Sequence, residues 1–330
     1  MSKLKMNNPL VTVNILSYNR KDELRYTLTK VFEQDYKNIE VIVVDNASSD
    51  GTQEMVKTEY PNVNLIELNE NIGIAGWNKG FEVAKGEYVL VLDDDSYPGK
   101  NAINFVIPKF WNNNKIAICA LKIINGSRAR DETSDFKFPY IHFVGCGAII
   151  RKKVFFEVGG FDPQLFIYAH ESDFSIRVID FGYTITFENT SIIYHRTNKY
   201  ATHPINNSFY FFFSSRNNIL LNFKYLPICW AISVTSKYII NRILVAAYFG
   251  YSRVLLRVLL ESFTMILLKR IKRYKINKNT LILFNYRKMP IFDREYFGKL
   301  IDKDDSKFLF VNRYFKTLFY SKQKKKEFLF

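Results

Sequence analysis

The sequence predicts an α/β domain with a mostly parallel central sheet over residues 1–220, followed by a helical, basic region over residues 221–330. Two observations support this fold class. Short apolar runs rich in β-branched residues alternate with segments whose apolar residues recur at helical spacing, which is the pattern of βαβ units. Basic residues are then concentrated in the second region, which holds 23 Lys and Arg against 7 Asp and Glu. The two regions therefore differ in composition as well as in predicted structure.

The first elements of the chain form one βαβ unit. Residues 10–16 are predicted to be a strand, residues 21–34 an amphipathic helix, and residues 39–46 a second strand. Five later runs are also predicted to be strands, at residues 63–68, 87–93, 116–124, 143–150 and 183–195. Most of these runs are apolar on both faces, as strands are when helices cover both sides of a sheet.

The second region begins with an apolar segment at residues 226–270 that single polar residues interrupt. A single helix over most of this segment would carry a polar stripe made of Arg242, Arg253, Arg257 and Glu261. Basic clusters follow at residues 269–279 and at the end of the chain, residues 321–330. Large apolar faces next to basic clusters predict attachment to an anionic membrane surface. One alternative is that these helices pack on the α/β domain. The other is a nucleic-acid surface, which the apolar faces disfavour, so we expect no nucleic-acid partner.

The three cysteines, Cys119, Cys146 and Cys229, are too few and too scattered for a disulfide framework or a thiolate metal site. We expect three buried thiols in a reducing compartment. No uncharged apolar run reaches the ~18 residues of a membrane-spanning helix. The expected location is therefore cytoplasmic, peripheral on the inner face of the cell membrane.

Polar residues follow several of the predicted strands. Ligands of open α/β sheets bind beyond the carboxyl ends of the strands, so these residues are the candidates for a binding site. Ser17, Tyr18, Asn19 and Arg20 follow the first strand, and Asp45 ends the second. Asp45 is placed to accept a hydrogen bond from a nucleobase or a ribose hydroxyl. The alternative for the segment after Asp45 is an ordinary loop and helix cap.

Three consecutive acids, Asp93, Asp94 and Asp95, end the fourth strand. Adjacent carboxylates repel one another and persist at low cost only if water or a cation neutralises them. Asp93 and Asp95 form an Asp-x-Asp pair on one side of the chain, and such oxygen ligands suit Mg²⁺ or Mn²⁺ holding a nucleotide diphosphate. Asp94 is expected to point the other way and to be the most replaceable of the three. The alternative is a solvated acidic turn.

The segment 69–80 combines glycines with amides. Gly73 and Gly76 are expected to let the backbone approach a ligand closely, and Asn71 and Asn78 to supply amide donors. The segment lacks the ending of a phosphate-binding Walker loop and is not a dinucleotide fingerprint. The spacing alone is a weak signal for ligand binding.

Two further residues are candidates for chemistry. His195 lies at the tip of an apolar strand, where it could complete a metal site together with Asp95. Glu171 begins a predicted helix on the same rim and is placed to take a proton from an incoming hydroxyl group. A lone surface histidine and a stabilising acid in a first helical turn are the alternatives.

The order of these motifs resembles that of family-two glycosyltransferases of the GT-A fold, a Rossmann-like fold. The resemblance covers about residues 9–220 and is carried by the stretches VTVNILSYNR, IEVIVVDNASSDGT, NENIGIAGWNKG, YVLVLDDDSYP, GCGAIIRKKVFFEVGGFDPQLFIYAHESDFSIRVIDFGY and IIYH. Within that family the sequence is most similar to the bacterial branch that includes rhamnosyltransferases and galactofuranosyltransferases.

The resemblance implies transfer of a sugar with inversion, from a nucleotide-diphosphate donor such as dTDP-rhamnose or UDP-galactofuranose to a glycan acceptor. It implies that Asp45 contacts the base, Asp93 the ribose or the sugar, and that Asp95 and His195 bind the metal. The family's catalytic helix begins with two acids, one other residue and a third acid. Here the stretch is HESD, which makes Glu171 the expected base and Asp173 the alternative.

A lipid-linked glycan acceptor in bacterial surface polysaccharide synthesis fits both the basic region and the family analogy. The alternative function is a non-catalytic protein that binds a nucleotide sugar or a lipid-linked glycan. Such a protein would be expected to have lost the acidic triplet or the base, and this chain keeps both.

Overall fold

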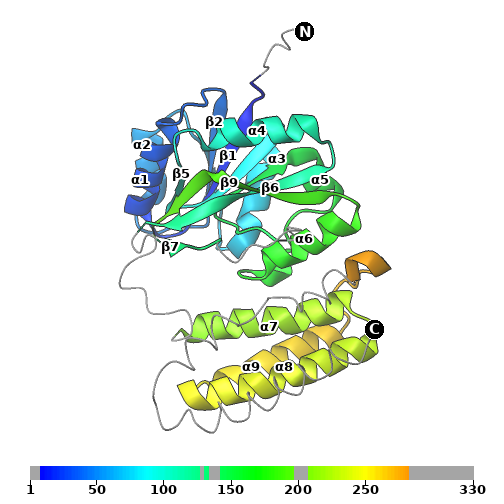
Figure 1. Ribbon diagram of the computed structural model, residues 1–330. Coiled ribbons are helices and arrows are strands. Elements are labelled where there is room, and N and C mark those ends of the chain that lie inside the picture. The colour runs from blue at the N-terminus through cyan, green and yellow to red at the C-terminus, as the bar shows by residue number, and fades with distance from the viewer. Residues whose placement is uncertain (1–7, 127–129, 134–141, 197–206, 282–330) are drawn as a thin grey trace.

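The computed structural model describes residues 8–126, 130–133, 142–196 and 207–281. It consists of a central sheet covered by helices on both faces, followed by a layer of three long helices on one side of the sheet domain (Figure 1). The basic chain end at residues 321–330 lies outside the described residues.

The sheet is mixed, and its strands run in the order β3-β2-β1-β4-β8-β6-β9-β5, with β7 paired to β6. Neighbours β3, β2, β1 and β4 are parallel, as are β6 and β9, whereas β8, β5 and β7 pair antiparallel. The strands are β1 (Val11–Ser17), β2 (Ile39–Asp45), β3 (Asn64–Glu67), β4 (Tyr88–Asp93), β5 (Ser96–Pro98), β6 (Ile116–Asn125), β7 (Arg130–Asp131), β8 (Ala148–Arg151) and β9 (Thr184–His195).

Helices cover both faces of this sheet. They are α1 (Lys21–Phe32), α2 (Thr52–Glu59), α3 (Gly76–Val83), α4 (Ala102–Asn112), α5 (Lys152–Glu157) and α6 (His170–Asp180), with 3-10 turns η1 (Gly73–Ala75) and η2 (Pro163–Leu165). One apolar core joins α1, α2 and α4 to one face of the sheet, and a second joins α3, α5 and α6 to the other. Because successive side chains of a strand alternate between faces, Val41 lies in the first core and Ile42 in the second.

The third layer contains α7 (Ser208–Tyr225), α8 (Ile228–Phe249) and α9 (Ser252–Leu267). Figure 1 shows α7 next to the sheet domain, with α8 and α9 on its far side. Residues 214–225 of α7 are all buried, because α7 is packed between the sheet domain and the other two helices. The domain boundary expected between residues 220 and 221 falls inside this continuous helix.

The segment 226–270 contains two helices, not the one helix considered for most of it. The chain turns back at Gly250, whose φ of 74° is readily adopted by glycine, and α8 and α9 form a hairpin. The expected polar stripe is divided accordingly. Arg242 is buried in α8 against the rings of Phe211 and Tyr238, and Glu261 of α9 pairs with Arg216 of α7.

Candidate functional site

The carboxyl ends of β1, β2 and β4 lie side by side because these strands are parallel neighbours. Strand β5 then pairs antiparallel with β9, with Ser96 opposite His195. This pairing brings the end of β9 to the acidic triplet, as the sequence predicted, although β5 itself was not anticipated. The Nε2 atom of His195 lies 3.4 Å from Oδ1 of Asp95.

Asp94 holds the end of β1 in place. Its carboxylate accepts hydrogen bonds from the hydroxyl of Ser17, the backbone N–H of Tyr18 and the guanidinium of Arg20, at 3.1, 3.3 and 3.1 Å. The side chain is almost fully buried. Because the loop after β1 is built around this carboxylate, the structure gives Asp94 a role in that loop that the sequence did not predict.

Arg20 joins two of the acids. It contacts Asp95 at 2.9 Å and Asp94 at 3.1 Å, so one guanidinium bridges the pair. Asn19, with a φ of 52°, accepts a hydrogen bond from Ser49 N–H and ties the loop after β1 to the loop after β2. Ser17, Asn19 and Arg20 thus shape the rim, and Tyr18, whose side chain is exposed, borders it.

The pKa values of Asp93 and Asp94 are raised, which means that the surroundings do not fully stabilise the negative charge of the triplet. Burial, together with the charge of Asp95, raises the pKa of Asp93 to about 7. Burial raises the pKa of Asp94 to about 7 against the opposing effect of Arg20. Although burial opposes both shifts, contact with His195 lowers the pKa of Asp95, and contacts with Asp95 and Glu132 raise the pKa of His195 to about 10.

The residues around His195 fit a divalent cation. The Nδ1 atom of His195 lies 3.0 Å from Oε2 of Glu132, so Nε2 is left to face Asp95. A carboxylate on the far nitrogen is the usual way in which proteins orient a metal-binding histidine. Ligand atoms of Asp93, Cys146 and His195 lie within 4.8 Å of one another. Burial raises the pKa of Cys146 well above its usual value, and a neutral thiol is a poor ligand for Mg²⁺ or Mn²⁺.

Glu132 was missed by sequence reasoning. It lies just after the two-residue strand β7, and neither a strand end nor a motif marks it in the sequence. Cys229 also differs from expectation, since it is exposed, whereas Cys119 and Cys146 are buried as predicted.

Asp45 lies at the end of β2 with its carboxylate fully buried. Its Oδ2 atom accepts hydrogen bonds from the backbone of Ser48 and the amide of Gln53, at 3.0 and 2.7 Å. The other oxygen, Oδ1, is buried without a hydrogen-bond partner. A buried acceptor without a donor is costly, so this atom is suited to a donor that a ligand brings.

The segment after β3 is occupied by contacts within the protein. Both polar groups of the Asn78 side chain bond the backbone of Phe161, at 2.9 and 3.0 Å, so Asn78 is not the free amide that was expected. Asn71 accepts a hydrogen bond from the N–H of Gly73. At Gly73 (φ 64°) a Cβ would lie 2.0 Å from the carbonyl oxygen of Phe166. The backbone of Gly73 therefore lies close to the loop before α6, and the backbone of Gly76 lies close to the side chain of Leu16. Both glycines make room for other parts of the protein.

Glu171 and Asp173 lie in very different surroundings in the first turn of α6. The Glu171 side chain keeps 19% of its surface exposed and accepts a hydrogen bond from Gly145 N–H at 3.3 Å. Gly145 precedes Cys146, whose Sγ lies within 4.8 Å of ligand atoms of Asp93 and His195, so Glu171 and the triplet border one site. Asp173 is fully buried, with its two oxygens occupied by Arg177, Lys224 and Tyr225. These contacts occupy both oxygens of Asp173, whereas the Glu171 carboxylate keeps part of its surface open.

His170, which replaces the family's usual first acid, is buried between the rings of Trp77 and Phe161, with centroid distances of 5.6 Å to each. Burial lowers the pKa of His170, so its imidazole is neutral near pH 7. Its Nδ1 lies 3.3 Å from Oε2 of Glu171. An uncharged ring therefore contacts the carboxylate of the candidate base.

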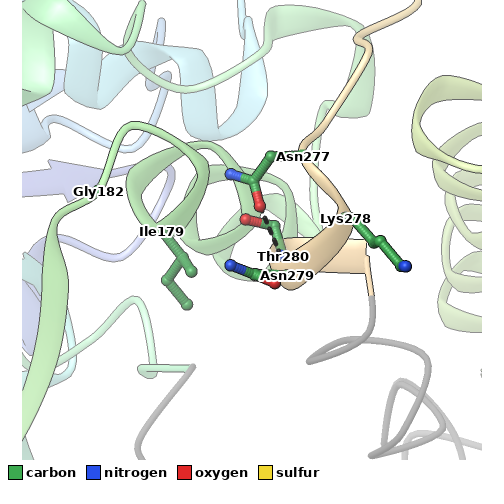
Figure 2. Close-up of a pocket in the computed structure, with 6 residues that line it drawn as sticks. All are labelled: Ile179, Gly182, Asn277, Lys278, Asn279 and Thr280. Atoms are coloured by element: carbon green, nitrogen blue, oxygen red, sulfur yellow. Dashed lines mark hydrogen bonds between the residues drawn. The ribbon is translucent and has the colours of Figure 1, made fainter.

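A concavity of about 510 Å³ lies away from this site (Figure 2). It is lined by Ile179 and Gly182 at the far end of α6 and by residues 277–280. The backbone N–H of Thr280 donates a hydrogen bond to the side-chain oxygen of Asn277 at 2.9 Å. The backbone N–H of Asn277 donates one to the carboxylate of Asp180. No carboxylate, histidine or cysteine lines this concavity, so it lacks the groups of the site above.

The mixed sheet, the acidic triplet after β4 and the histidine that ends β9 are arranged as in the GT-A fold. Residues 12–171, almost half of the chain, match the family model described as Glycosyl transferase family 2.

Curated relatives agree with this assignment. An uncharacterized glycosyltransferase of Rickettsia typhi is 30% identical over 214 residues, which is 59% of this chain and 66% of the relative. A UDP-Glc:alpha-D-GlcNAc-diphosphoundecaprenol beta-1,3-glucosyltransferase of Escherichia coli is 38% identical over 90 residues, which is 27% of this chain and 36% of the relative. The chain thus spans less than two thirds of the curated relatives that it matches.

A solved structure supports the fold. The mannosyltransferase of Pyrobaculum calidifontis, in complex with GDP-Man and Mn²⁺, superimposes with a TM-score of 0.51 at 17% identity. The match covers 88% of this chain and 82% of the mannosyltransferase, so it extends beyond the sheet domain.

Proposed function

We propose that this protein transfers a sugar from a nucleotide-diphosphate donor to a hydroxyl of a lipid-linked glycan, with inversion at the anomeric carbon, in bacterial surface polysaccharide synthesis. The observation that carries the proposal is that Asp93, Asp95 and His195 lie together and that Gly145, next to Cys146 of the same cluster, donates a hydrogen bond to Glu171. A purely binding protein has no need of a partly exposed carboxylate next to the acidic triplet. The donor remains predicted as dTDP-rhamnose or a UDP-sugar such as UDP-galactofuranose.

The acids and the histidine at the strand ends would bind the donor and its metal ion. The free oxygen of Asp45 receives a hydrogen bond from the nucleobase or ribose. Asp95 and His195, with Asp93 beside them, would hold Mg²⁺ or Mn²⁺, which when bound stabilises negative charge on the departing diphosphate. Arg20 keeps Asp95 in position through a contact of 2.9 Å.

Glu171 acts on the acceptor. Its carboxylate takes the proton of the attacking hydroxyl, while the hydrogen bond from Gly145 N–H orients the carboxylate and the ring of His170 packs beside it. Attack from the side opposite the diphosphate inverts the anomeric centre. General base catalysis of this kind contributes roughly 10² to 10⁴-fold to the rate.

A screen of nucleotide sugars for metal-dependent donor hydrolysis tests this function. One sugar nucleotide should be hydrolysed in the presence of Mn²⁺ or Mg²⁺ and not in EDTA. In the same assay Glu132→Gln should raise the Mn²⁺ concentration for half-maximal rate by about 10 to 100-fold, because the ring of His195 loses its carboxylate partner. Lys122→Gln, a change at an exposed ion pair with Asp131 nearby, is the control. Donor hydrolysis that is unaffected by EDTA would contradict the metal site.

The outer face of the α8–α9 hairpin supports attachment to a membrane. The exposed apolar side chains of α9 are Leu256, Leu260, Phe263 and Leu267, which recur every three or four residues and form one stripe. On α8, residues such as Trp230, Ile232 and Ile243 are also about half exposed. Arg242 of α8 and Glu261 of α9 contact α7 instead, so these charged groups lie between helices while apolar side chains face outward.

α8 is long and apolar enough to cross a membrane by length and composition, with a mean hydropathy of 1.3. It nevertheless contains Lys237, which is exposed, and Arg242, which is buried against aromatic rings. It also packs along α7 and α9 in one layer. We infer that the hairpin lies in the interface of an anionic membrane, on the inner face of the cell membrane, and does not span it.

The leucine stripe provides a direct test of membrane attachment. Leu256→Glu combined with Leu260→Glu should abolish sedimentation with vesicles that contain anionic lipid, because two charges would enter the apolar layer. Phe105→Glu combined with Phe181→Glu changes two equally exposed apolar residues of the sheet domain and should leave sedimentation intact. If the leucine variant sedimented like the wild type, α9 would not be the attachment surface.

A further inference from the structure

A groove of about 610 Å³ lies between α9, the start of α7 and the loop before α6. Its apolar wall is formed by the rings of Phe166, Phe209, Phe212 and Phe213, and its rim carries Arg253 and Arg257. Phe213 stacks on Phe166 at 5.1 Å between ring centroids and contacts Phe209 at 4.7 Å and Phe212 at 5.0 Å. Four packed rings therefore make a continuous apolar surface with two cations at its edge.

The two arginines are available to an anion. They are one helical turn apart on α9, both are exposed, and in the part of the chain that the structure describes neither pairs with a carboxylate. The guanidinium of Arg257 lies over the ring of Phe212 at 4.8 Å, which leaves the N–H groups at its edge free. Paired guanidinium groups of this kind suit the oxygens of a phosphate or diphosphate.

The groove leads to the catalytic rim at one end. Phe166 O accepts a hydrogen bond from the backbone of Ile74 at 2.7 Å, next to the loop after β3. Two residues further on, the ring of Tyr168 contacts Tyr210 of α7 at 4.8 Å. Tyr168 precedes His170 by two residues, and Nδ1 of His170 lies 3.3 Å from Oε2 of Glu171, so the loop that lines the groove leads directly into the candidate site.

The other side of the groove leads to the outer surface of α9. On a helical wheel Arg253 and Arg257 lie next to Leu256 and Leu260, which belong to the exposed apolar stripe. An apolar chain that enters from the membrane along this stripe would meet the aromatic wall, with its charged end at the arginines. The Escherichia coli relative is named for an acceptor carried on diphosphoundecaprenol, a lipid of this chemistry.

We propose that this groove binds the diphosphate end of an isoprenoid lipid that carries the acceptor glycan, with Arg253 and Arg257 on the phosphates and the aromatic wall on the first isoprene units. The proposal rests on the proposed function, since it assigns to the same reaction an acceptor of this class. It places the sugar of the acceptor next to Tyr168, on the path from the groove to Glu171.

Calorimetric titration of the full chain with farnesyl diphosphate tests the groove. EDTA is present throughout, so that diphosphate cannot bind through a cation at Asp95 and His195. Wild-type protein should bind farnesyl diphosphate at least tenfold more tightly than either farnesol or inorganic diphosphate. Arg253→Gln combined with Arg257→Gln should weaken this binding at least tenfold. Lys237→Gln combined with Lys275→Gln removes the same charge from exposed positions outside the groove and should have no effect.

A second variant probes the apolar wall. Phe209 is 45% exposed, so Phe209→Ser can be made without opening the core, and it should weaken the binding of farnesyl diphosphate but not of inorganic diphosphate. Unchanged binding by the arginine variant, or equal binding of farnesol and farnesyl diphosphate, would overturn the proposal. Donor hydrolysis by the wild type is measured separately. Its absence together with arginine-dependent binding would refute the transfer reaction and retain the lipid site.

Discussion

Glu171→Gln is expected to lower kcat for sugar transfer by at least ~100-fold while the protein remains folded, because the amide cannot accept the proton of the acceptor hydroxyl. Glutamine keeps the size of the side chain and its Oε1 can still accept the hydrogen bond from Gly145 N–H. The rate is measured with the donor found in the nucleotide-sugar screen and its acceptor, and folding is measured by urea denaturation.

The comparison that isolates the base is with Glu54→Gln. Glu54 is an exposed acid on α2 whose substitution removes the same charge away from the site, and its variant should turn over at the wild-type rate. Because the proton is removed only as the bond forms, the KM for the donor should change little in Glu171→Gln. Turnover within a few fold of wild type would remove Glu171 from the mechanism.

The site residues at the strand ends could be predicted because each one directly follows an apolar strand in the sequence. A buried parallel strand followed at once by polar residues marks the carboxyl edge of the sheet, and this identified Asp45, the triplet and His195. The choice between Glu171 and Asp173 could not be made in this way. Both are acids in one helical turn, and only the packing of Lys224 and Tyr225 against Asp173 separates them.

Other features depend on partners that are distant in the chain. Asp94 is fixed by the loop after β1, more than 70 residues earlier, and Asn78 by the backbone of Phe161. β5 has three residues and is a strand only because β9 pairs with it. Glu132 contacts His195 from a segment without a sequence pattern.

The helical layer illustrates a further limit. Composition predicted an apolar, basic region, but it could not indicate which face turns outward. In the structure the charged groups Arg216 and Glu261 meet between helices, while Leu256 and Leu260 of α9 are exposed. The hydrophobic pattern of a helix shows which side chains share a face. Which face is covered depends on the helices that pack against it.

Lys224→Met is expected to lower the free energy of unfolding by about 3 to 5 kcal/mol, the range for removing one partner of a buried ion pair. The lysine of α7 reaches Asp173 of α6 and also Asp162, at 2.6 Å, with only 3% of its side chain exposed. Methionine fills much of the same volume but leaves the carboxylate of Asp173 with Arg177 and Tyr225 alone.

The effect is measured by urea denaturation at pH 7 and again near pH 3. Although burial opposes the shift, Arg177 and Lys224 hold the pKa of Asp173 below its usual value. The stability that Asp173 contributes is therefore present above the unfolded pKa of about 3.9 and lost as the pH falls toward the folded value. The difference between wild type and Lys224→Met should narrow at the lower pH.

Lys57→Met is the matched control, because Lys57 forms an exposed ion pair with Glu67 at 2.8 Å and its loss should change stability little. An equal loss of stability at both pH values would assign the effect of Lys224→Met to packing of the lysine stem. A loss at pH 7 no larger than that of the control would mean that the contacts of Lys224 do not fasten α7 to the sheet domain. If the loss at pH 7 is large and narrows with acid, the ion pair joins the helical layer to the helix that carries Glu171. The membrane surface and the catalytic base would then be mechanically connected through one buried lysine.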